Sequence, residues 1–509
     1  MSYEQIFNEI KKTHESKVMY SIQYRISLLK DFQKAIKENE QLILDALWED
    51  RHKSKAQAKL TELTGVYHEL NYFISNLKNL AKPRYEKSSM QTINAKVYTQ
   101  AFPMGPTLIV TPFNYPVNLS LIPLIGSIAS GNPVVLKYSK STPAVQRAVT
   151  QILLLAKIPT SVVSIYTFET SMLFNVTYSL VIFTGSTQTG KSVFSSCSKT
   201  LTKCILELGG ANPCVVFEDA DLENAAQQVA ILKFTNSGQT CITCNYLSFI
   251  GSEQKFQKFQ ELLTKYMSRY VNNYEHVVKI DGKAKYDELT QLSKHSLVQV
   301  FNDKVIFDNE SEKAERIAKQ RDSELFPPTL LQVKGDEEFV TKEIFGPVLP
   351  MFRMESMQEF KNWFNSRYSE QAKPLSSYLF TKNKQNKKEF KQLIQAGAIN
   401  INQGLLYVNS SLPFGGVGES GLGSYHGIYS FNAFSHMQPV FEIKPGKTPI
   451  MISKALAKLQ LVPYSLQFGD AMMNMSSHQC NINWVTVLGV LCTLILAWAI
   501  AVTVVLSKK

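Results

Sequence analysis

The chain has 509 residues, of which 44% are hydrophobic and 19% are charged. This composition excludes a disordered chain, and 24 Gly and 20 Pro exclude a collagen-like or linker-dominated one. The 54 Lys and Arg outnumber the 42 Asp and Glu, but the basic residues are scattered among acidic ones rather than clustered with aromatic residues. Because nucleic-acid binding favours such clusters, we expect no nucleic-acid partner.

The cysteines and the N-terminus indicate where the main body of the chain resides. The cysteines are Cys197, Cys204, Cys214, Cys241, Cys244, Cys480 and Cys492. An odd number in a long chain argues against a disulfide framework. The N-terminus, MSYEQIFNEIKK, is polar and lacks the apolar core of a secretory signal. We therefore expect the body to lie in the reducing cytosol.

Helical periodicity with many Lys and Glu runs through residues 1–80, and a βαβ pattern follows from about residue 95. The predicted helices are Tyr20–Glu38, Gln41–Asp50, Lys55–Leu80, Val117–Ser130, Leu222–Thr235 and Lys255–Arg269. The predicted strands are Thr107–Thr111, Pro133–Lys137, Val162–Tyr166, Ser179–Thr184, Cys204–Leu208 and Pro213–Phe217. Together they predict an α/β fold.

Two long segments carry no charge, and they predict different structures. Ala101–Leu136 contains six prolines, which divide it into a buried β-loop-α-β unit. Val485–Leu506 has 22 residues with neither proline nor charge. As a helix it is about 33 Å long, which is enough for a bilayer core. We therefore expect a single C-terminal membrane span.

The segment Gly185–Ser192, GSTQTGKS, follows a predicted strand and fits the formal P-loop pattern. Downstream, the apolar run Cys214–Asp219 ends in acids, as a Walker B strand does. A tail-anchored P-loop NTPase that uses Lys191, Ser192 and Asp219 is therefore one hypothesis. Dinucleotide sites also place a phosphate at a glycine-rich strand-to-helix turn, so the segment predicts a phosphate site without deciding the nucleotide.

Two further segments carry reactive groups. Glu207 precedes two glycines in ELGG, at the end of a predicted strand. In NSGQTC, Cys241 lies in a small polar loop, where a thiolate could be exposed and a backbone N–H could face a developing oxyanion. Cys241 and Cys244 form a C-x-x-C, but a redox dithiol or a zinc site needs a context or further ligands that the sequence does not show. We therefore expect no metal site.

Seven motifs occur in an order and spacing that resemble the aldehyde dehydrogenase superfamily. They are TPFNYP (Thr111–Pro116), LKYSK (Leu136–Lys140), FTGSTQTGK, ELGG, NSGQTC, KEIFGPV (Lys342–Val348) and LPFGGVGESGLGSYHG (Leu412–Gly427). The YHG and SFNAFSH endings and the C-terminal span look like the class 3 branch, which includes fatty aldehyde dehydrogenase. The resemblance covers about residues 20–440 plus the tail.

The resemblance implies a Rossmann-type dinucleotide-binding domain, an α/β catalytic domain and a bridging or oligomerisation segment. The dinucleotide-binding domain would occupy residues 1–80 and 104–208, and the catalytic domain residues 209–410. The bridging segment would occupy residues 81–103 and 411–441. A tether over 442–484 and a transmembrane tail anchor over 485–506 would follow. In the family, homodimers form through strands of the bridging segment. Here Asn94–Phe102 and residues near Phe431–Phe441 could supply them.

The resemblance also implies roles for individual residues. Cys241 would be the nucleophile, and the Asn114 amide with the Cys241 backbone N–H would bind the oxyanion. Glu207 would be the general base that activates water for thioester hydrolysis. The residues implied to bind NAD or NADP are Lys137, Lys140, Gly185, Ser186, Gly190, Glu343 and Phe345.

The cofactor motif departs from the family pattern at one informative position. The usual Lys-Pro-Ser-Glu is here Lys137-Tyr138-Ser139-Lys140, so a lysine replaces the acid that would accept both hydroxyls of the adenine ribose. An acid there repels a 2′-phosphate, whereas a lysine can pair with one. We therefore expect the enzyme to tolerate NADP.

The anchor also suggests the substrate and the location. A long-chain aldehyde partitions into lipid, so an enzyme held at a membrane meets it at a high local concentration. We therefore expect medium- to long-chain fatty aldehydes as substrates, and the family suggests the endoplasmic reticulum as the membrane. A catalytically idle scaffold of the same fold is a further alternative, which the presence of Cys241, Glu207 and Asn114 disfavours.

Overall fold

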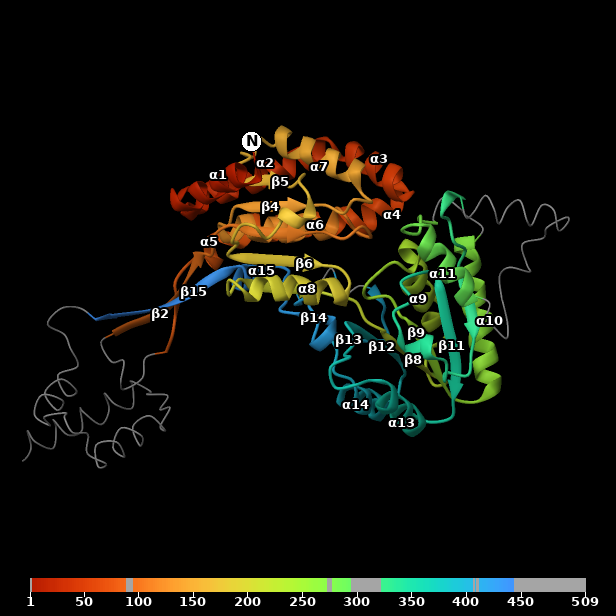
Figure 1. Ribbon diagram of the computed structural model, residues 1–509. Coiled ribbons are helices and arrows are strands. Elements are labelled where there is room, and N and C mark those ends of the chain that lie inside the picture. Colours follow the sequence, from red (N-terminus) through yellow and green to blue (C-terminus); the bar gives the residue numbers. More distant parts are fainter. Residues whose placement is uncertain are drawn as a thin grey trace, which may run out of the picture. The chain divides into compact units, whose positions relative to one another are not determined.

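The structure is a computed structural model that describes residues 2–87, 95–271, 277–293, 322–405, 408 and 412–443. The chain divides into two compact units, Met1–Ala81 with Ala101–His436 and Lys82–Gln100 with Met437–Lys509. The first unit contains two six-stranded sheets, and helices cover both faces of each (Figure 1). This arrangement is an α/β fold, as predicted.

The first sheet has the strand order β14-β7-β6-β3-β4-β5. Its strands are β3 (Thr107–Val110), β4 (Val134–Lys137), β5 (Val163–Ile165), β6 (Leu180–Thr184), β7 (Lys203–Glu207) and β14 (Gly421–Leu422). Neighbouring strands are parallel except β14, which pairs antiparallel with β7 and places Gly421 opposite Glu207. The carboxyl ends of the parallel strands therefore meet at one edge of the sheet.

Two sets of helices cover the faces of the first sheet. The helices are α1 (Tyr3–Glu15), α2 (Ile22–Glu38), α3 (Glu40–Arg51), α4 (Lys55–Ala58), α5 (Thr64–Leu80), α6 (Asn118–Ser130), α7 (Pro143–Leu155), α8 (Thr187–Ser198) and α15 (Ile428–Ala433). Successive strand side chains point to opposite faces. Leu108 therefore packs with residues of α1 and α8, and Ile109 packs with residues of α2, α3, α5, α6 and α7.

The second sheet is entirely parallel and has the order β10-β11-β9-β8-β12-β13. Its strands are β8 (Pro213–Phe217), β9 (Tyr246–Ile250), β10 (Thr329–Gln332), β11 (Val348–Met354), β12 (Ser376–Phe380) and β13 (Ala398–Ile401). Its helices are α9 (Leu222–Phe234), α10 (Glu253–Val271), α11 (Lys283–Ser293), α13 (Met357–Arg367) and α14 (Lys384–Leu393). Residues of α9 and α10 pack on one face, and residues of α11, α13 and α14 pack on the other.

A third sheet has the order β1-β2-β15 and consists of β1 (Arg84–Tyr85), β2 (Ala95–Pro103) and β15 (Ser435–Ile443). Both segments that the sequence predicted to supply bridging strands therefore contain a strand. The second strand starts later than Phe431, because Ile428–Ala433 forms α15. The ion pair between Lys96 and Glu442, 3.5 Å long, joins the two.

The predicted secondary structure differs from the observed one at two places near the N-terminus. Helix α1 lies in the region of predicted helical periodicity but was not given bounds, although Tyr3, Phe7 and Ile10 bury one face of it. The predicted helix Lys55–Leu80 is interrupted by a π-helical turn at Lys59–Leu63, between α4 and α5. No Pro or Gly marks this turn in the sequence, and the turn buries the side chain of Glu62 completely.

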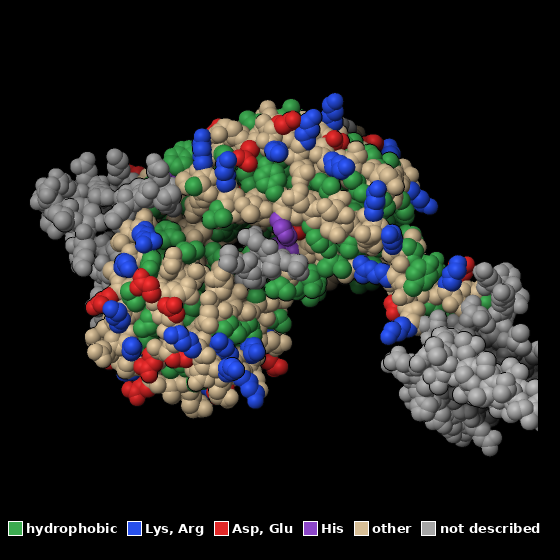
Figure 2. All heavy atoms as spheres, turned by 180° about the vertical axis from the view of Figure 1, so that it is seen from behind, with side chains coloured by type: hydrophobic (Ala, Val, Ile, Leu, Met, Phe, Trp, Pro, Cys, Tyr) green, Lys and Arg blue, Asp and Glu red, His purple; other side chains and the backbone are tan. Residues whose placement is uncertain are grey.

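On the face of the molecule seen in Figure 2, Lys and Arg side chains are interspersed with Asp and Glu and do not form a stripe. The longest basic cluster of the sequence, Lys382–Lys391, lies mainly in α14. Phe390 is the buried residue of this helix, and most of its lysines are exposed to solvent. The cluster is thus a solvated helix face.

Among the described helices, none is both long enough and apolar enough to cross a membrane. The predicted membrane span Val485–Leu506 lies outside the described residues, as does nearly all of the predicted tether.

Candidate active site

A cleft of about 1000 Å³ is lined by residues that flank both six-stranded sheets. The predicted site residues that line it are Asn114, Lys137, Lys140, Gly185, Ser186, Glu207, Cys241, Glu343 and Phe345. They lie at or just after the carboxyl ends of β3, β4, β6 and β7, or precede β9 and β11. Ligands bind at the carboxyl ends of strands in open parallel sheets, so the fold places this cleft where a binding site is expected.

Gly190 is the predicted site residue that does not line the cleft. It lies inside α8, where a Cβ atom would come within 2.5 Å of the Leu208 side chain, so it permits close packing of the helix against the segment after β7. The turn before α8 is formed by Gly185 and Ser186, and the Ser186 side chain caps the helix by accepting from Thr189 N. The N-terminus of α8 thus faces the cleft with its free N–H groups.

The residues of the P-loop hypothesis do not converge. Lys191 Nζ lies 2.6 Å from Glu419 Oε1, and the Lys191 side chain is largely exposed. Asp219 follows β8 of the second sheet, where it accepts hydrogen bonds from Thr381 Oγ1 at 2.7 Å and from Asn383 N at 2.9 Å. Ser192 lines the cleft, but neither Lys191 nor Asp219 does.

The loop that carries Cys241 has an unusual backbone. Asn236, Ser237 and Gly238 have positive φ values of 56°, 50° and 67°. A Cβ atom on Gly238 would come within 2.2 Å of Gly346 O, so only glycine fits there. Non-glycine residues in the left-handed region cost free energy and are typical of functional sites. Side-chain hydrogen bonds hold the loop, since Asn236 Nδ2 donates to Gln239 O and Ser237 Oγ accepts from Val278 N.

The Cys241 thiol is half-buried at the inner end of the cleft. Burial, together with the nearby Glu207 and Glu343 carboxyls, raises its pKa to about 12. The backbone N–H groups of Cys241 and Ile242 hydrogen-bond to the thiol and act in the opposite direction. The free thiol is therefore protonated at neutral pH, and it needs a base before it can act as a nucleophile.

Asn114 faces the same end of the cleft and is 4% exposed. Its Nδ2 donates to Gln239 O at 3.0 Å, two residues before Cys241. A carboxamide nitrogen carries two hydrogens, so a second N–H is available for an oxyanion on Cys241. The structure thus brings together the two groups that the sequence predicted for the oxyanion hole.

Glu207 ends β7 and is 1% exposed. Neither carboxyl oxygen has a hydrogen-bond partner among the described residues, and burial raises the pKa of Glu207 well above its usual value. Buried polar groups are normally paired, because an unpaired one is costly. Both oxygens can therefore accept a hydrogen bond from a water molecule in the cleft or bind a proton.

The outer end of the cleft carries two lysines. Lys137 is half-buried and donates from Nζ to Tyr138 O at 3.3 Å, whereas Lys140 is exposed. Burial lowers the pKa of Lys137, and the positive charge of Lys140 lowers it further. Two neighbouring cations attract an anion, so this end fits a phosphate-bearing ligand.

Glu343 and Phe345 belong to the loop before β11. Gly210 N donates to Glu343 Oε1 at 3.1 Å, and the carboxyl group is open to the solvent of the cleft. Desolvation by the surrounding protein raises the pKa of Glu343 to about 7, although the hydrogen bond from Gly210 N acts in the opposite direction. Phe345 has a positive φ of 45°. The centroids of the Phe345 and Phe113 rings are 5.9 Å apart, and the two rings are in a T-shaped arrangement.

The second cysteine of the C-x-x-C does not face the cleft. Cys244 is completely buried, and its thiol hydrogen-bonds to the Cys214 thiol. All five cysteines in the described part of the chain are free. Within that part, no group of three or more His, Cys, Asp and Glu side chains is arranged to hold a metal ion.

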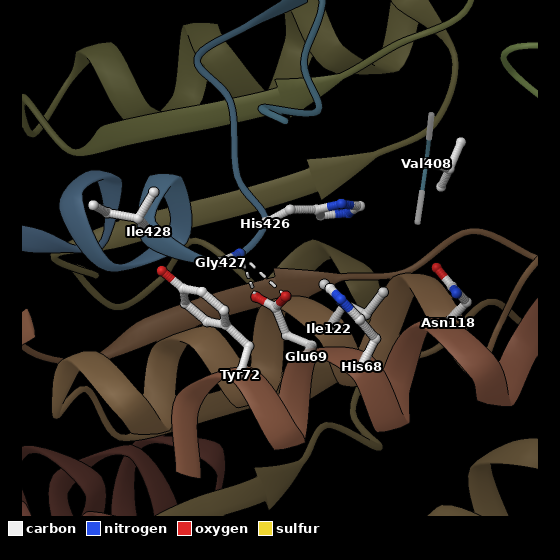
Figure 3. A pocket seen from close by; sticks show the side chains of 10 residues that line it. His68, Glu69, Tyr72, Asn118, Ile122, Val408, His426, Gly427 and Ile428 are labelled. Carbon is white, nitrogen blue, oxygen red and sulfur yellow. Dashed lines mark hydrogen bonds between the residues drawn. The ribbon is translucent and has the colours of Figure 1, made fainter. Parts of the chain in front are cut away.

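Figure 3 shows a second, enclosed cavity of about 30 Å³, enough for one or two water molecules. Glu69 of α5 points to the start of α15, where its two oxygens accept from Gly427 N at 2.8 and 3.1 Å (Figure 3). Burial raises the pKa of Glu69 to about 7. Burial, together with the charge of His68, lowers the pKa of the neighbouring His426 to about 4. Sequence reasoning missed this cavity, although His426 and Gly427 lie in the GSYHG motif.

Sequence reasoning also missed the residues that hold the nucleophile loop. Asn212 Nδ2 donates to Cys241 O at 2.7 Å and to Thr243 O at 2.9 Å. Arg51, which ends α3, donates to Gln239 Oε1 at 3.2 Å. Asn212 and Gln239 lie beside or within the ELGG and NSGQTC motifs, which was the available signal, whereas nothing in the sequence near Arg51 marks it.

The aldehyde dehydrogenase family profile matches residues 2–440. The chain belongs to the aldehyde dehydrogenase family. It is 32% identical over 448 residues to an aldehyde dehydrogenase of Craterostigma plantagineum, which covers 86% of this chain and 90% of that protein. It is 30% identical over 444 residues to aldehyde dehydrogenase family 3 member A2 of Rattus norvegicus, which covers 86% of this chain and 87% of that protein.

A solved structure agrees with these relatives. The substrate-bound state of Staphylococcus aureus AldH superimposes with a TM-score of 0.79 at 30% identity, and the match covers 90% of this aldehyde dehydrogenase and 99% of that chain. The chain is therefore an oxidoreductase with the aldehyde dehydrogenase fold. The superfamily resemblance is confirmed, with class 3 relatives, and the P-loop NTPase hypothesis is wrong.

Proposed function

We propose that this aldehyde dehydrogenase oxidises aldehydes to carboxylic acids through a covalent intermediate on Cys241, with Asn114 binding the oxyanion and Glu207 acting as the base. One observation carries the proposal. Three segments that are far apart in the sequence bring a thiol, an amide N–H and an unpaired carboxyl group to the inner end of one cleft.

The first half of the reaction uses Cys241 and Asn114. The thiol passes its proton to a water molecule in the cleft, and its sulfur forms a bond to the carbonyl carbon of the aldehyde. The negative charge that develops on the carbonyl oxygen is stabilised by Asn114 Nδ2–H and the Cys241 backbone N–H. When bound, NAD(P)⁺ supplies an acceptor for the hydride that leaves this carbon. The acyl group then remains on Cys241 as a thioester.

The second half of the reaction uses Glu207. The carboxylate takes a proton from a water molecule, whose oxygen attacks the thioester carbon. The carbon–sulfur bond then breaks, which releases the carboxylic acid and restores the thiol. A raised pKa suits this role, because it makes the carboxylate a stronger base than an exposed glutamate.

The residues of the outer end fit a dinucleotide. Gly185 and Ser186 form a turn at the N-terminus of α8, which suits the pyrophosphate. Lys137 would contact the adenine-side ribose, and Glu343 would accept from the hydroxyls of the nicotinamide ribose. Because Lys140 stands beside Lys137 without a neighbouring acid in the motif, we propose that NADP is accepted as well as NAD.

We propose medium- to long-chain fatty aldehydes as the substrates, because the chain resembles the class 3 branch, which includes fatty aldehyde dehydrogenase, and has a class 3 relative. A series of linear aldehydes of increasing length tests this point by steady-state kinetics. We expect kcat/KM to rise with chain length over the medium-chain range, since each buried CH₂ adds about 0.8 kcal/mol. No gain with length would count against fatty aldehydes.

We propose that residues 485–506 anchor the enzyme in the endoplasmic reticulum membrane and that the catalytic body lies in the cytosol. We also propose that two copies form a homodimer through strands β2 and β15. The support is the uncharged 22-residue segment and the two bridging strands. Removing residues 485–509 should move the protein from the membrane to the soluble fraction. Unchanged membrane association would contradict the anchor.

The activity itself is tested by aldehyde-dependent formation of NAD(P)H, followed by absorbance. The wild-type protein is compared with Cys241→Ser and with Cys244→Ala, which alters the buried cysteine of the same C-x-x-C. We expect activity in the wild type and in Cys244→Ala, and none in Cys241→Ser. Activity that survives Cys241→Ser would refute the proposed nucleophile, and an inactive wild type would indicate an idle scaffold.

A further inference from the structure

A fully buried ion pair lies behind the oxyanion-hole residue. Lys53 Nζ and Glu62 Oε1 are 2.5 Å apart, and both side chains are 0% exposed. Lys53 lies in the connection between α3 and α4, and Glu62 lies in the π-helical turn between α4 and α5. Neither residue lines the cleft, so the pair contacts neither substrate nor cofactor.

The pair holds both ends of the segment that carries Asn114. Lys53 Nζ donates to Asn114 O at 3.0 Å and stands over the Tyr115 ring, 4.4 Å from its centroid. Glu62 Oε2 accepts from Val117 N at 3.1 Å and from Asn118 N at 2.9 Å, at the start of α6. One ion pair thus fixes the backbone of residues 114–118.

The same contacts continue to the nucleophile loop. Asn114 O accepts a second hydrogen bond, of 3.0 Å, from Asn236 Nδ2, which also donates to Gln239 O at 3.0 Å. Gln239 O in turn accepts from Asn114 Nδ2 at 3.0 Å. These bonds close a ring through Asn114, Asn236 and Gln239, and Lys53 attaches this ring to the buried pair.

A buried ion pair is poor evidence for stability, because its desolvation cost offsets much of the attraction between the charges. Apolar residues of the same volume could fill the space with similar stability. They could not, however, donate to the Asn114 carbonyl or accept from the N–H groups of Val117 and Asn118. The directed hydrogen bonds are therefore what the charged residues add at this place.

We propose that Lys53 and Glu62 are positioning residues that set the direction of the Asn114 amide toward the oxyanion on Cys241. This inference rests on the proposed function of Asn114. Breaking the pair should misdirect the amide and reduce the chemical step, while cofactor binding at the outer end of the cleft remains unchanged.

The test combines Lys53→Met with Glu62→Gln. Either change alone leaves one buried group without its partner, and we expect it to lower Tm. The double variant removes both charges while the Gln amide oxygen can still accept from Val117 N and Asn118 N, so we expect its Tm to recover toward that of the wild type. Its kcat should stay about 10- to 100-fold below the wild type, because small displacements of catalytic groups are costly. The KM for the cofactor should not change.

A double-mutant cycle with Asn114→Ala distinguishes a positioning role of the Lys53–Glu62 pair from a general effect on the structure. Asn114→Ala alone should lower kcat by about 10²- to 10³-fold. If the pair acts through Asn114, adding Lys53→Met and Glu62→Gln to Asn114→Ala should lower kcat little further. Lys53→Arg, which keeps a charged donor, should retain more activity than Lys53→Met. As a control, the corresponding changes at the half-buried pair Lys361–Glu389 of α13 and α14 should leave kcat unchanged.

Two outcomes would overturn the inference and leave the proposed function intact. One is wild-type kcat in the double variant while Asn114→Ala is impaired. The other is a loss of equal size with and without Asn114. Wild-type kcat in Asn114→Ala would instead refute the oxyanion role, and with it the proposed function. If the double variant does not fold, Lys53→Met with and without Asn114→Ala provides the same cycle, because this change alone removes the donor to Asn114 O.

Discussion

The two ends of the cleft differ in how their side chains are held. At the inner end, Asn114 and Glu207 are at most 4% exposed, and Cys241 lies in a loop fixed by buried hydrogen bonds. At the outer end, Lys140 is exposed, and the half-buried Lys137 donates to a carbonyl of its own segment. The side chains of the inner end are buried or held by hydrogen bonds, whereas Lys140 at the outer end is solvated.

This difference predicts what each end contributes. Charges and dipoles act more strongly where water is excluded, so the inner end can stabilise charge that develops during the chemical step. Charges in contact with water are screened by salt, so the outer end should contribute mainly to cofactor binding and cofactor preference. Variants of the inner end should change kcat strongly, and variants of the outer end should change KM moderately.

The largest effect is expected for Glu207→Gln. The amide cannot take a proton from water, so kcat should fall by about 10²- to 10⁴-fold. Thioester formation does not need this base, so a burst of NAD(P)H close to one per site should precede the slow turnover. Stopped-flow absorbance measures both phases. Glu419→Gln changes an exposed carboxyl group and should behave like the wild type, whereas a fast steady state in Glu207→Gln would show that another group activates the water.

The buried Glu69 should make the free energy of unfolding depend on pH. Its folded-state pKa of about 7 lies above the usual 4.5, so the folded protein holds this proton more tightly than the unfolded chain. The stability that this group contributes is therefore complete below about pH 4.5 and is lost as the pH rises through about 7, by about 3 kcal/mol at most.

Glu69→Gln removes this titration and retains an acceptor for Gly427 N. The difference in free energy of unfolding between the variant and the wild type should therefore move in favour of the variant between pH 5 and pH 8. Urea unfolding at a series of pH values measures it, and the comparison cancels the opposite titration of His426. A difference that does not depend on pH would mean that Glu69 is not held protonated by burial.

The smallest effect is expected at the outer end, for Lys140→Glu. The change removes the cation proposed to pair with the 2′-phosphate, so the KM for NADP should rise about tenfold, with little change in kcat. The KM for NAD should change less, and higher salt should reduce the difference. The control is Lys30→Glu, which reverses the charge of an exposed residue in α2. A strong preference of the wild type for NAD at equal concentrations would refute the role of Lys140.

Elements with a strong local pattern could be predicted from the sequence. The strand Pro213–Phe217 has the predicted bounds, because a buried parallel strand is a short apolar run between breakers. The site residues could be assembled because each lies in a motif with an ordered place in the chain. The bounds of helix α1 escaped prediction, since Tyr3, Phe7 and Ile10 are few apolar residues in a mainly polar segment.

The supporting residues of the site could not be predicted for a physical reason. Arg51, Lys53 and Glu62 lie in a region rich in charged residues, where such side chains normally face solvent. Their burial depends on the π-helical turn and on packing against the start of α6, which only the folded chain brings together. Local sequence indicates which residues carry the chemistry more readily than which residues hold them in place.

The most direct test of the account is the mass of the protein during turnover. Glu207→Gln is mixed with an aldehyde and NAD(P)⁺, quenched in acid, and analysed by mass spectrometry of the intact protein and of its peptides. If Cys241 is the nucleophile, the peptide that contains it should carry an added acyl group, formed only when the oxidised cofactor is present. An acyl group on another cysteine, or none despite a burst of NAD(P)H, would contradict it.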